Sequence, residues 1–200
     1  MSKLTFPAKK LAVMGVLTAL SLVAFLIENL FPPLLIPGAK LGIANAFSFT
    51  ALIIYSPVEA FIIVAVRTLL GAVFAGNISA VMYSFTGGIV SLIAGSVLMY
   101  LVHPKISVTC VSVVSATLHN LTQNAVFVII SATPLAFAYA PYLMLIGAVS
   151  GAFIGMTVTL LIKRIPTATL QKLIASGRLK KDDKTQRDNN TEQEVEVESN

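Results

Sequence analysis

Four strongly polar side chains interrupt a long apolar run in the stretch LHNLTQNAVF, residues 118–127: His119, Asn120, Gln123 and Asn124. An imidazole and three carboxamides are directional hydrogen-bonding groups, which are suited to holding a small molecule. A metal site is a poor fit, because no second histidine, cysteine or carboxylate is placed beside His119. On a helix, one stripe contains Ser112, Ser115, His119, Thr122 and Gln123, with Asn120 and Asn124 on its flank. Unpaired polar groups facing lipid cost several kcal/mol, so the stripe should face a protein interior.

Other polar and charged residues fall at a similar depth. Arg67 is central in an apolar segment, where a charge costs about 2.5–3.5 kcal/mol even on insertion scales. Glu28 lies in the outer third of the first segment. Asn45 lies about one turn below the outer end of the second apolar segment, and Lys40 lies just before that end. The inner half is nearly free of such residues, so we predict a polar pocket that opens outward.

A purely structural interpretation stays open for these residues. Asparagine and glutamine often bridge membrane helices, at about 0.6 kcal/mol each. Arg67 could simply pair with Glu28. For Arg67 and His119 we favour a functional role, because ionisable groups at mid-membrane depth are costly and usually mark a functional site.

The chain that must position these groups is strongly apolar. Of its 200 residues, 56% are hydrophobic and 12% are charged, and its mean hydropathy is +0.85. This composition is typical of a polytopic membrane protein. The formal charge of +5 does not indicate nucleic-acid binding, because most charges lie at the two ends of the chain, as membrane anchors do.

Six apolar segments are candidates for membrane helices, which need about 20 residues each. They cover residues 11–31, 41–56, 58–75, 79–102, 107–130 and 139–162. The runs are too long and continuous for the strands of a membrane barrel. We therefore expect an all-α protein, a six-helix transmembrane bundle.

The distribution of lysine and arginine predicts that both termini are cytoplasmic. The cations that support this orientation are Lys3, Lys9, Lys10, Lys105, Lys163 and Arg164, whereas the alternate loops hold only Lys40. The predicted regions are a cytoplasmic N-terminus over residues 1–10 and a transmembrane domain over 11–163. An interfacial helix over 164–176 and a disordered, charged cytoplasmic tail over 177–200 follow.

Small residues recur at helical spacing in three rails, which are Gly15 with Ala19, Gly87 with Ser91 and Gly95, and Gly147 with Gly151 and Gly155. Such spacing lets helix backbones approach closely. At least two of the rails are expected to serve internal packing. The rail on the first helix could instead dock a partner membrane protein.

The sequence lacks the motifs that several classes of enzyme chemistry require. No P-loop pattern is present, so ATP hydrolysis would have to come from partner subunits. Chemistry on a diphosphate needs clustered carboxylates to hold Mg²⁺, but Glu28 and Glu59 fall near opposite membrane faces. We expect neither an enzyme nor a bound cofactor. The single cysteine, Cys110, is expected to be a packed, inert thiol.

Three stretches carry a family resemblance: IPGAKLGIANAFSFTAL (36–52), FTGGIVSLIAGSVLMYL (85–101) and VSVVSATLHNLTQNAVF (111–127). They resemble the Gx transporter family, whose members are often labelled heptaprenyl diphosphate synthase component I. That family is similar in plan to the substrate-binding S components of energy-coupling factor (ECF) vitamin transporters. Family members often read His-Asn-x-Gly-Gln, whereas Thr122 stands at the glycine position here.

The resemblance implies a membrane protein of the bacterial plasma membrane that captures a small molecule from outside. An ECF transmembrane coupling subunit and ATPase subunits would supply the energy, and Gly15 with Ala19 resembles the docking surface for such a partner. Arg67 and Lys40 would attract an anionic or carbonyl-bearing group, while Glu28 would orient Arg67 or a cationic group. Hydrogen bonds to the substrate would come from Asn45, His119, Asn120, Gln123 and Asn124.

Two other functions stay open. One is the membrane subunit of a heptaprenyl diphosphate synthase, and the other is a ligand-free membrane scaffold in which Arg67 is locked to Glu28. For the substrate, the resemblance points to a flavin or another redox-linked cofactor, with a prenyl or quinone precursor as the alternative.

Overall fold

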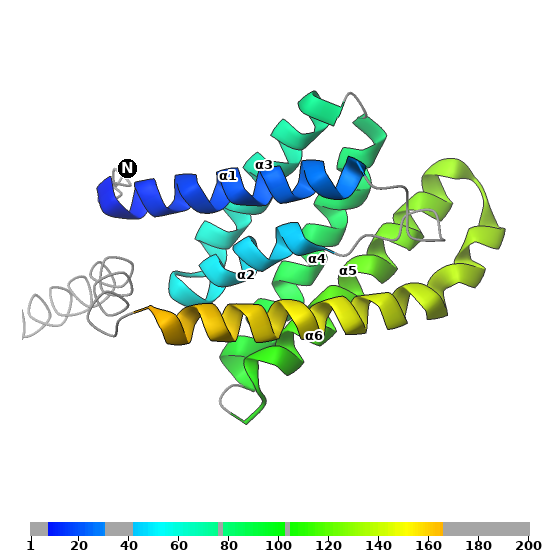
Figure 1. The fold of residues 1–200 in the computed structure, drawn as a ribbon. Coiled ribbons are helices and arrows are strands. Elements are labelled where there is room, and N and C mark those ends of the chain that lie inside the picture. Colours follow the sequence, from blue (N-terminus) through cyan, green and yellow to red (C-terminus); the bar gives the residue numbers. More distant parts are fainter. Residues whose placement is uncertain (1–7, 31–41, 76–77, 103–104, 166–200) are drawn as a thin grey trace, which may run out of the picture.

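The computed structural model of the chain describes residues 8–30, 42–75, 78–102 and 105–165, and these residues form an all-helical bundle (Figure 1). The helices are α1 (Ala8–Leu30), α2 (Ile43–Ile54), α3 (Pro57–Ala75), α4 (Ile78–Leu101), α5 (Val108–Ser131) and α6 (Ala140–Arg164), with a 3₁₀ helix, η1 (Pro134–Tyr139), before α6. The all-α prediction is confirmed, and each helix coincides with one of the six predicted segments to within a few residues.

The second helix is the exception in length. At 1.5 Å per residue, its 12 residues extend about 18 Å, less than the roughly 30 Å of a bilayer core. Five helical segments of the described chain are long and apolar enough to cross a membrane, and α2 is a shorter apolar helix. The predicted interfacial helix and tail fall outside the described residues, apart from Arg164 and Ile165, as do Lys40 and most of the predicted cytoplasmic N-terminus.

The surface of the bundle is covered by large apolar side chains. Val73 on α3, Leu101 on α4 and Ile129 on α5 are each more than three-quarters exposed. Many further large apolar side chains are exposed on all six helices, and a surface of this kind is suited to lipid. The chain is a multi-pass cell-membrane protein.

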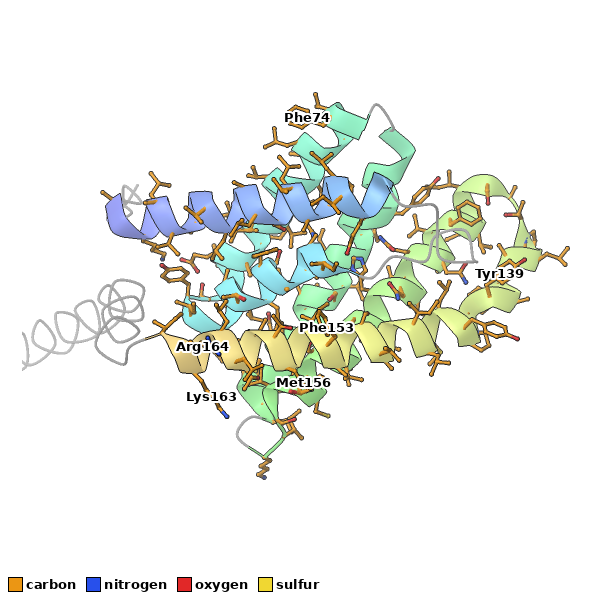
Figure 2. All side chains as sticks on the ribbon, in the orientation of Figure 1. Phe74, Tyr139, Phe153, Met156, Lys163 and Arg164 are labelled. Atoms are coloured by element: carbon orange, nitrogen blue, oxygen red, sulfur yellow. The ribbon has the colours of Figure 1, made fainter. Side chains whose placement is uncertain are left out.

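The first helix, α1, begins at the same end of the bundle at which the last helix, α6, ends. Figure 2 shows Lys163 and Arg164, at the end of α6, on the side where α1 begins, and Tyr139 at the opposite end. We call the side with Lys163 and Arg164 the basic end. Within the bundle, α3, α4 and α5 run obliquely across α1 and α6 in this view.

Local sequence signals start the helices that carry the site. The Ser56 side chain accepts a hydrogen bond from Val58 N, Pro57 is the first residue of α3, and the Ser56 hydroxyl donates to Glu59. The Ser56 side chain therefore caps the start of α3 by satisfying one of its free N–H groups, and proline is tolerated at the first helical position. Ser107 caps α5 by accepting from Cys110 N at 3.1 Å.

Glycine allows a tight entry into α2. Gly42 adopts the left-handed conformation, with φ of 71°, and its carbonyl accepts a hydrogen bond from Asn45 N at 2.8 Å. A side chain at this φ is strained, and a Cβ would lie 3.3 Å from Asn45 Nδ2. Gly42 therefore positions the first turn of α2 and the asparagine in it.

Two of the three small-residue rails pack helices together, as predicted. Along α6, a Cβ added at Gly147, Gly151 or Gly155 would come within 2.6–2.8 Å of an α5 backbone Cα atom. On α4, Gly87 and Gly95 face α5 in the same way. Gly15 on α1 has nothing within 4 Å of an added Cβ, and both Gly15 and Ala19 are exposed.

Substituting alanine at Gly151 and at Gly15 should therefore have opposite effects on stability. At Gly151 the new Cβ meets Val113 Cα at 2.7 Å, so backbone must move, at a cost of about 1–3 kcal/mol. At Gly15 the methyl meets open space and alanine gains up to about 1 kcal/mol of helix propensity. Thermal unfolding in detergent should show a lower midpoint for Gly151→Ala and an equal or higher one for Gly15→Ala. Equal midpoints would contradict the close α5–α6 contact.

The expectation that Cys110 is packed is wrong, because this cysteine is exposed near the start of α5. Lys10, one of the cations that favour a cytoplasmic N-terminus, is itself 5% exposed and forms an ion pair with Glu59 of α3. The Lys10 ammonium also lies 5.4 Å from the centroid of the Tyr55 ring. Hydropathy alone does not predict this burial, because it does not reveal which partner a neighbouring helix will supply.

Candidate functional site

Five helices bring polar side chains to one cavity. Its lining residues are Phe25, Glu28, Gly42, Ala44, Asn45, Arg67, Ser84, His119 and Gln123. We call it the arginine cavity. Its volume open to water centres is about 10 Å³, room for a single water. Five of the eight residues expected to bind substrate therefore meet in one place: Glu28, Asn45, Arg67, His119 and Gln123.

Arg67 is the central charge of this cavity. Its side chain is 3% exposed, and its Nη2 donates a hydrogen bond to Asn45 Oδ1 of α2 at 3.0 Å. Within the described part of the chain, Nε has no hydrogen-bond partner. A guanidinium has five donors in a planar fork, so the group retains hydrogen-bonding capacity for a carboxylate or carbonyl oxygen.

Glu28 is the carboxylate among the described residues that line this cavity. Its carboxylate accepts a hydrogen bond from the backbone N–H of Ile43, the first residue of α2. Negative charge is favourable there, because the first N–H groups of a helix are unpaired and carry its positive dipole end. Glu28 thus ties α1 to the start of α2 while lining the same cavity as Arg67.

The side of the arginine cavity that α5 forms depends on the close approach of α4 to α5. A Cβ at Gly87 would lie 2.9 Å from Gln123 Cγ and 3.0 Å from the His119 carbonyl oxygen. The absence of a side chain at Gly87 lets His119 and Gln123 reach the cavity. Gln123 Nε2 also donates to Ser84 Oγ at 3.4 Å. Ser84 was not among the site residues predicted from the sequence, but it lines the arginine cavity.

Asn120 and Asn124 occupy different surroundings on α5. Asn120 is 3% exposed, and its Nδ2 donates to the Leu143 carbonyl of α6 at 3.3 Å, which is a helix-bridging contact. Asn124 is 5% exposed, and its Nδ2 has no partner among the residues that the structure describes. Their assignment to substrate binding stays a prediction, as does that of Lys40.

A second cavity lies deeper, toward the basic end. Its polar lining is Asn45, Ser48, Ser91, Ser112 and Ser115, and apolar residues from α2, α3, α4, α5 and α6 complete the wall. We call it the serine chamber. Its volume open to water centres is about 30 Å³. Its four serines were not among the site residues predicted from the sequence.

The serine chamber could have been found from helical spacing. Ser112 and Ser115 continue the His119 stripe toward the start of α5, and Ser48 follows Asn45 by about one turn on α2. This site was not recognised from the sequence, because single serines are common in membrane helices and do not by themselves indicate a binding site. Phe25 of α1 lines the arginine cavity, but nothing in its sequence context distinguishes it from other apolar residues of the helix.

Comparisons with known proteins agree with this architecture. Residues 17–161 match the family model described as heptaprenyl diphosphate synthase component I. No match was found among curated proteins. A solved structure described as the S component of a bacterial ECF transporter superposes with a TM-score of 0.64 at 20% identity, covering 78% of this chain and 95% of the other. These findings confirm the family resemblance and show an S-component fold.

Proposed function

The chain belongs to the heptaprenyl diphosphate synthase component I family, and from this premise and its fold we propose that it is the substrate-binding S component of an ECF-type transporter. It would take up a small vitamin- or cofactor-like molecule, such as a flavin. The observation that carries the proposal is the convergence of α1–α5 on a cavity with a buried guanidinium, a carboxylate and carboxamides. Such groups inside a membrane bundle are typical of a substrate site.

The fold supports an orientation with both termini in the cytoplasm. Because α1 begins and α6 ends at the basic end, the number of crossings between them is even (Figure 1). Cationic side chains favour the cytoplasmic face, so the arginine cavity belongs to the outer part and the serine chamber to the inner part. We include α2 as a short sixth crossing.

Energy would come from partner subunits, an ECF transmembrane coupling protein and ATPases. The exposed face of α1 around Gly15 and Ala19 is the surface we assign to that partner. Its small side chains allow a partner helix to approach the α1 backbone closely.

The proposal is tested by identifying the molecule that the protein carries. The full chain is purified in mild detergent, and extracted small molecules are quantified against protein by mass spectrometry. We expect one vitamin- or cofactor-like compound at near-stoichiometric amount. An Arg164→Met variant, altered at an exposed position at the end of α6, is the matched control and should carry the same amount. A protein that carries no such compound contradicts the proposal.

A second candidate is the membrane subunit of a prenyl diphosphate synthase, and the description of its family favours it. Reconstitution with a soluble synthase partner distinguishes the two functions. Prenyl diphosphate formation that requires this chain would support the synthase and overturn the transport proposal. A ligand-free scaffold would instead show neither a bound molecule nor synthase activity.

A further inference from the structure

Two serines of the serine chamber have hydroxyl groups without partners. Ser48 on α2 is 4% exposed and Ser115 on α5 is 5% exposed. Neither hydroxyl has a hydrogen-bond partner in the described residues, and both residues line the chamber. Buried polar groups are nearly always hydrogen-bonded, so two hydroxyl groups without hydrogen bonds in one cavity need an explanation.

Other hydroxyls of the bundle show what a structural serine or threonine does here. Thr50, Ser96 and Thr159 each donate to the backbone carbonyl four residues earlier, at 2.6–2.8 Å. This local bond is the usual way for a hydroxyl in a membrane helix to be satisfied. The hydroxyls of Ser48 and Ser115 do not make it, which leaves them available to a molecule in the chamber.

The two cavities share a wall. Asn45 lines both of them, and its Oδ1 accepts the hydrogen bond from Arg67. Gly88 lines the serine chamber, and an added Cβ there would lie 3.8 Å from Arg67 Nη2. The Arg67–Asn45 hydrogen bond is therefore a polar partition between the arginine cavity and the serine chamber.

Each compartment is too small for a complete ligand as it stands. Binding sites for small molecules enclose about 300–1,000 Å³. The cavity volume is only about 10 Å³ in the arginine cavity and about 30 Å³ in the serine chamber. Binding must therefore move side chains. We expect this movement at the Arg67–Asn45 hydrogen bond, because a ligand oxygen can replace Asn45 Oδ1 on Arg67 without leaving the buried guanidinium unpaired.

Resting on the proposed function, we propose that the ligand spans both cavities. Its carboxylate or carbonyl oxygen replaces Asn45 on Arg67, and an uncharged ring with hydrogen-bonding atoms on its edge enters the serine chamber. Apolar side chains such as Phe49, Leu52 and Leu92 contact the ring faces, while Ser48 and Ser115 bond its edge. Among the described residues, none that lines the chamber is charged, so the proposed ligand is neutral in this part.

The chemistry disfavours a prenyl diphosphate as the ligand. A prenyl chain has no atom that could bond Ser48 or Ser115, so both hydroxyls would stay desolvated and unsatisfied. Its diphosphate would face one arginine together with the carboxylate of Glu28. The arrangement instead fits a compact, largely apolar molecule with one acidic or carbonyl group and a polar-edged ring.

The test compares release of the molecule that the purified protein carries. Wild type, Ser48→Ala/Ser115→Ala and the control Ser150→Ala are diluted in detergent, and retained molecule is followed by mass spectrometry. Ser150 is a matched buried serine, but its hydroxyl donates to the Gly147 carbonyl on its own helix. Losing two hydrogen bonds should speed release by about tenfold in the double variant only.

The melting point of the ligand-free protein separates binding from structure. Removing orphan hydroxyls is neutral or stabilising, so the double variant should melt no lower than wild type once emptied. A lower melting point, or unchanged release, would overturn this inference. Unchanged release together with rapid release from Arg67→Met would confine the ligand to the arginine cavity and leave the transport proposal standing. A wild-type protein that carries no molecule would overturn both.

Discussion

Replacing Arg67 with methionine is expected to weaken binding of the transported molecule by about a hundredfold. The substitution keeps a long side chain but removes the guanidinium, which is 3% exposed and lies at the boundary of both cavities. A hydrogen bond to a charged group contributes about 1.5–3 kcal/mol, and about 2.7 kcal/mol corresponds to a factor of 100. The dissociation constant of the co-purifying molecule, measured by titration in detergent, checks the expectation.

A lysine at the same position separates charge from geometry. Arg67→Lys keeps the positive charge but loses the planar fork that can hold a carboxylate through two parallel hydrogen bonds. We expect its dissociation constant to lie between those of wild type and Arg67→Met. Arg164→Met, which changes an exposed arginine at the end of α6, should bind as wild type does. Wild-type affinity in Arg67→Met would leave the guanidinium a structural role and contradict its assignment to the substrate.

Breaking the buried ion pair at the basic end is expected to have the largest effect on stability. The side chains of Lys10 and Glu59 are 6% and 9% exposed, and Ser56 also donates to Glu59. Removing one partner leaves a buried charge uncompensated, at a cost of about 3–5 kcal/mol. Lys10→Met and Glu59→Met should each lower the free energy of unfolding by this amount.

The double variant tests whether the two charges act as a pair. In Lys10→Met/Glu59→Met no buried charge is left over, and apolar replacement of a buried pair is often neutral or stabilising. Its free energy of unfolding, from denaturant titration in detergent, should recover most of the loss seen in either single variant. Lys163→Met, at an exposed site near the end of α6, is the control and should change little. Strictly additive single effects would contradict the ion pair.

Helix positions were predictable because the bilayer imposes one simple requirement on sequence. Each membrane helix must be apolar over about 20 residues, so α1 and α3–α6 stand out in hydropathy alone. The short helix α2 was harder, since its length depends on the turn at Gly42 before it and on the Ser56 cap that starts α3 directly after it. The burial of Lys10 depends on α3 supplying Glu59, which no local pattern encodes.

The candidate site was predictable in part for the same reason. Arg67 and His119 are costly in lipid, and that cost forces them inward toward other polar groups. Their depth follows from their position along each helix. The pairing of Arg67 with Asn45, and of Gln123 with Ser84, was not predictable, because it depends on how α2, α3, α4 and α5 are rotated about their axes.

Sequence by itself determined that this chain is a helical membrane protein with an inward-facing polar stripe, because the bilayer penalises every exposed polar group in a way that composition and periodicity record. Only the tertiary structure decided which polar groups meet. Glycines at 87 and 88 let α4 approach α5 and α3 closely enough to form the arginine cavity, and residues of α2 to α6 together line the serine chamber around Ser48 and Ser115. Those contacts join residues far apart in the chain, so their geometry arises from helix packing and not from any local stretch of residues.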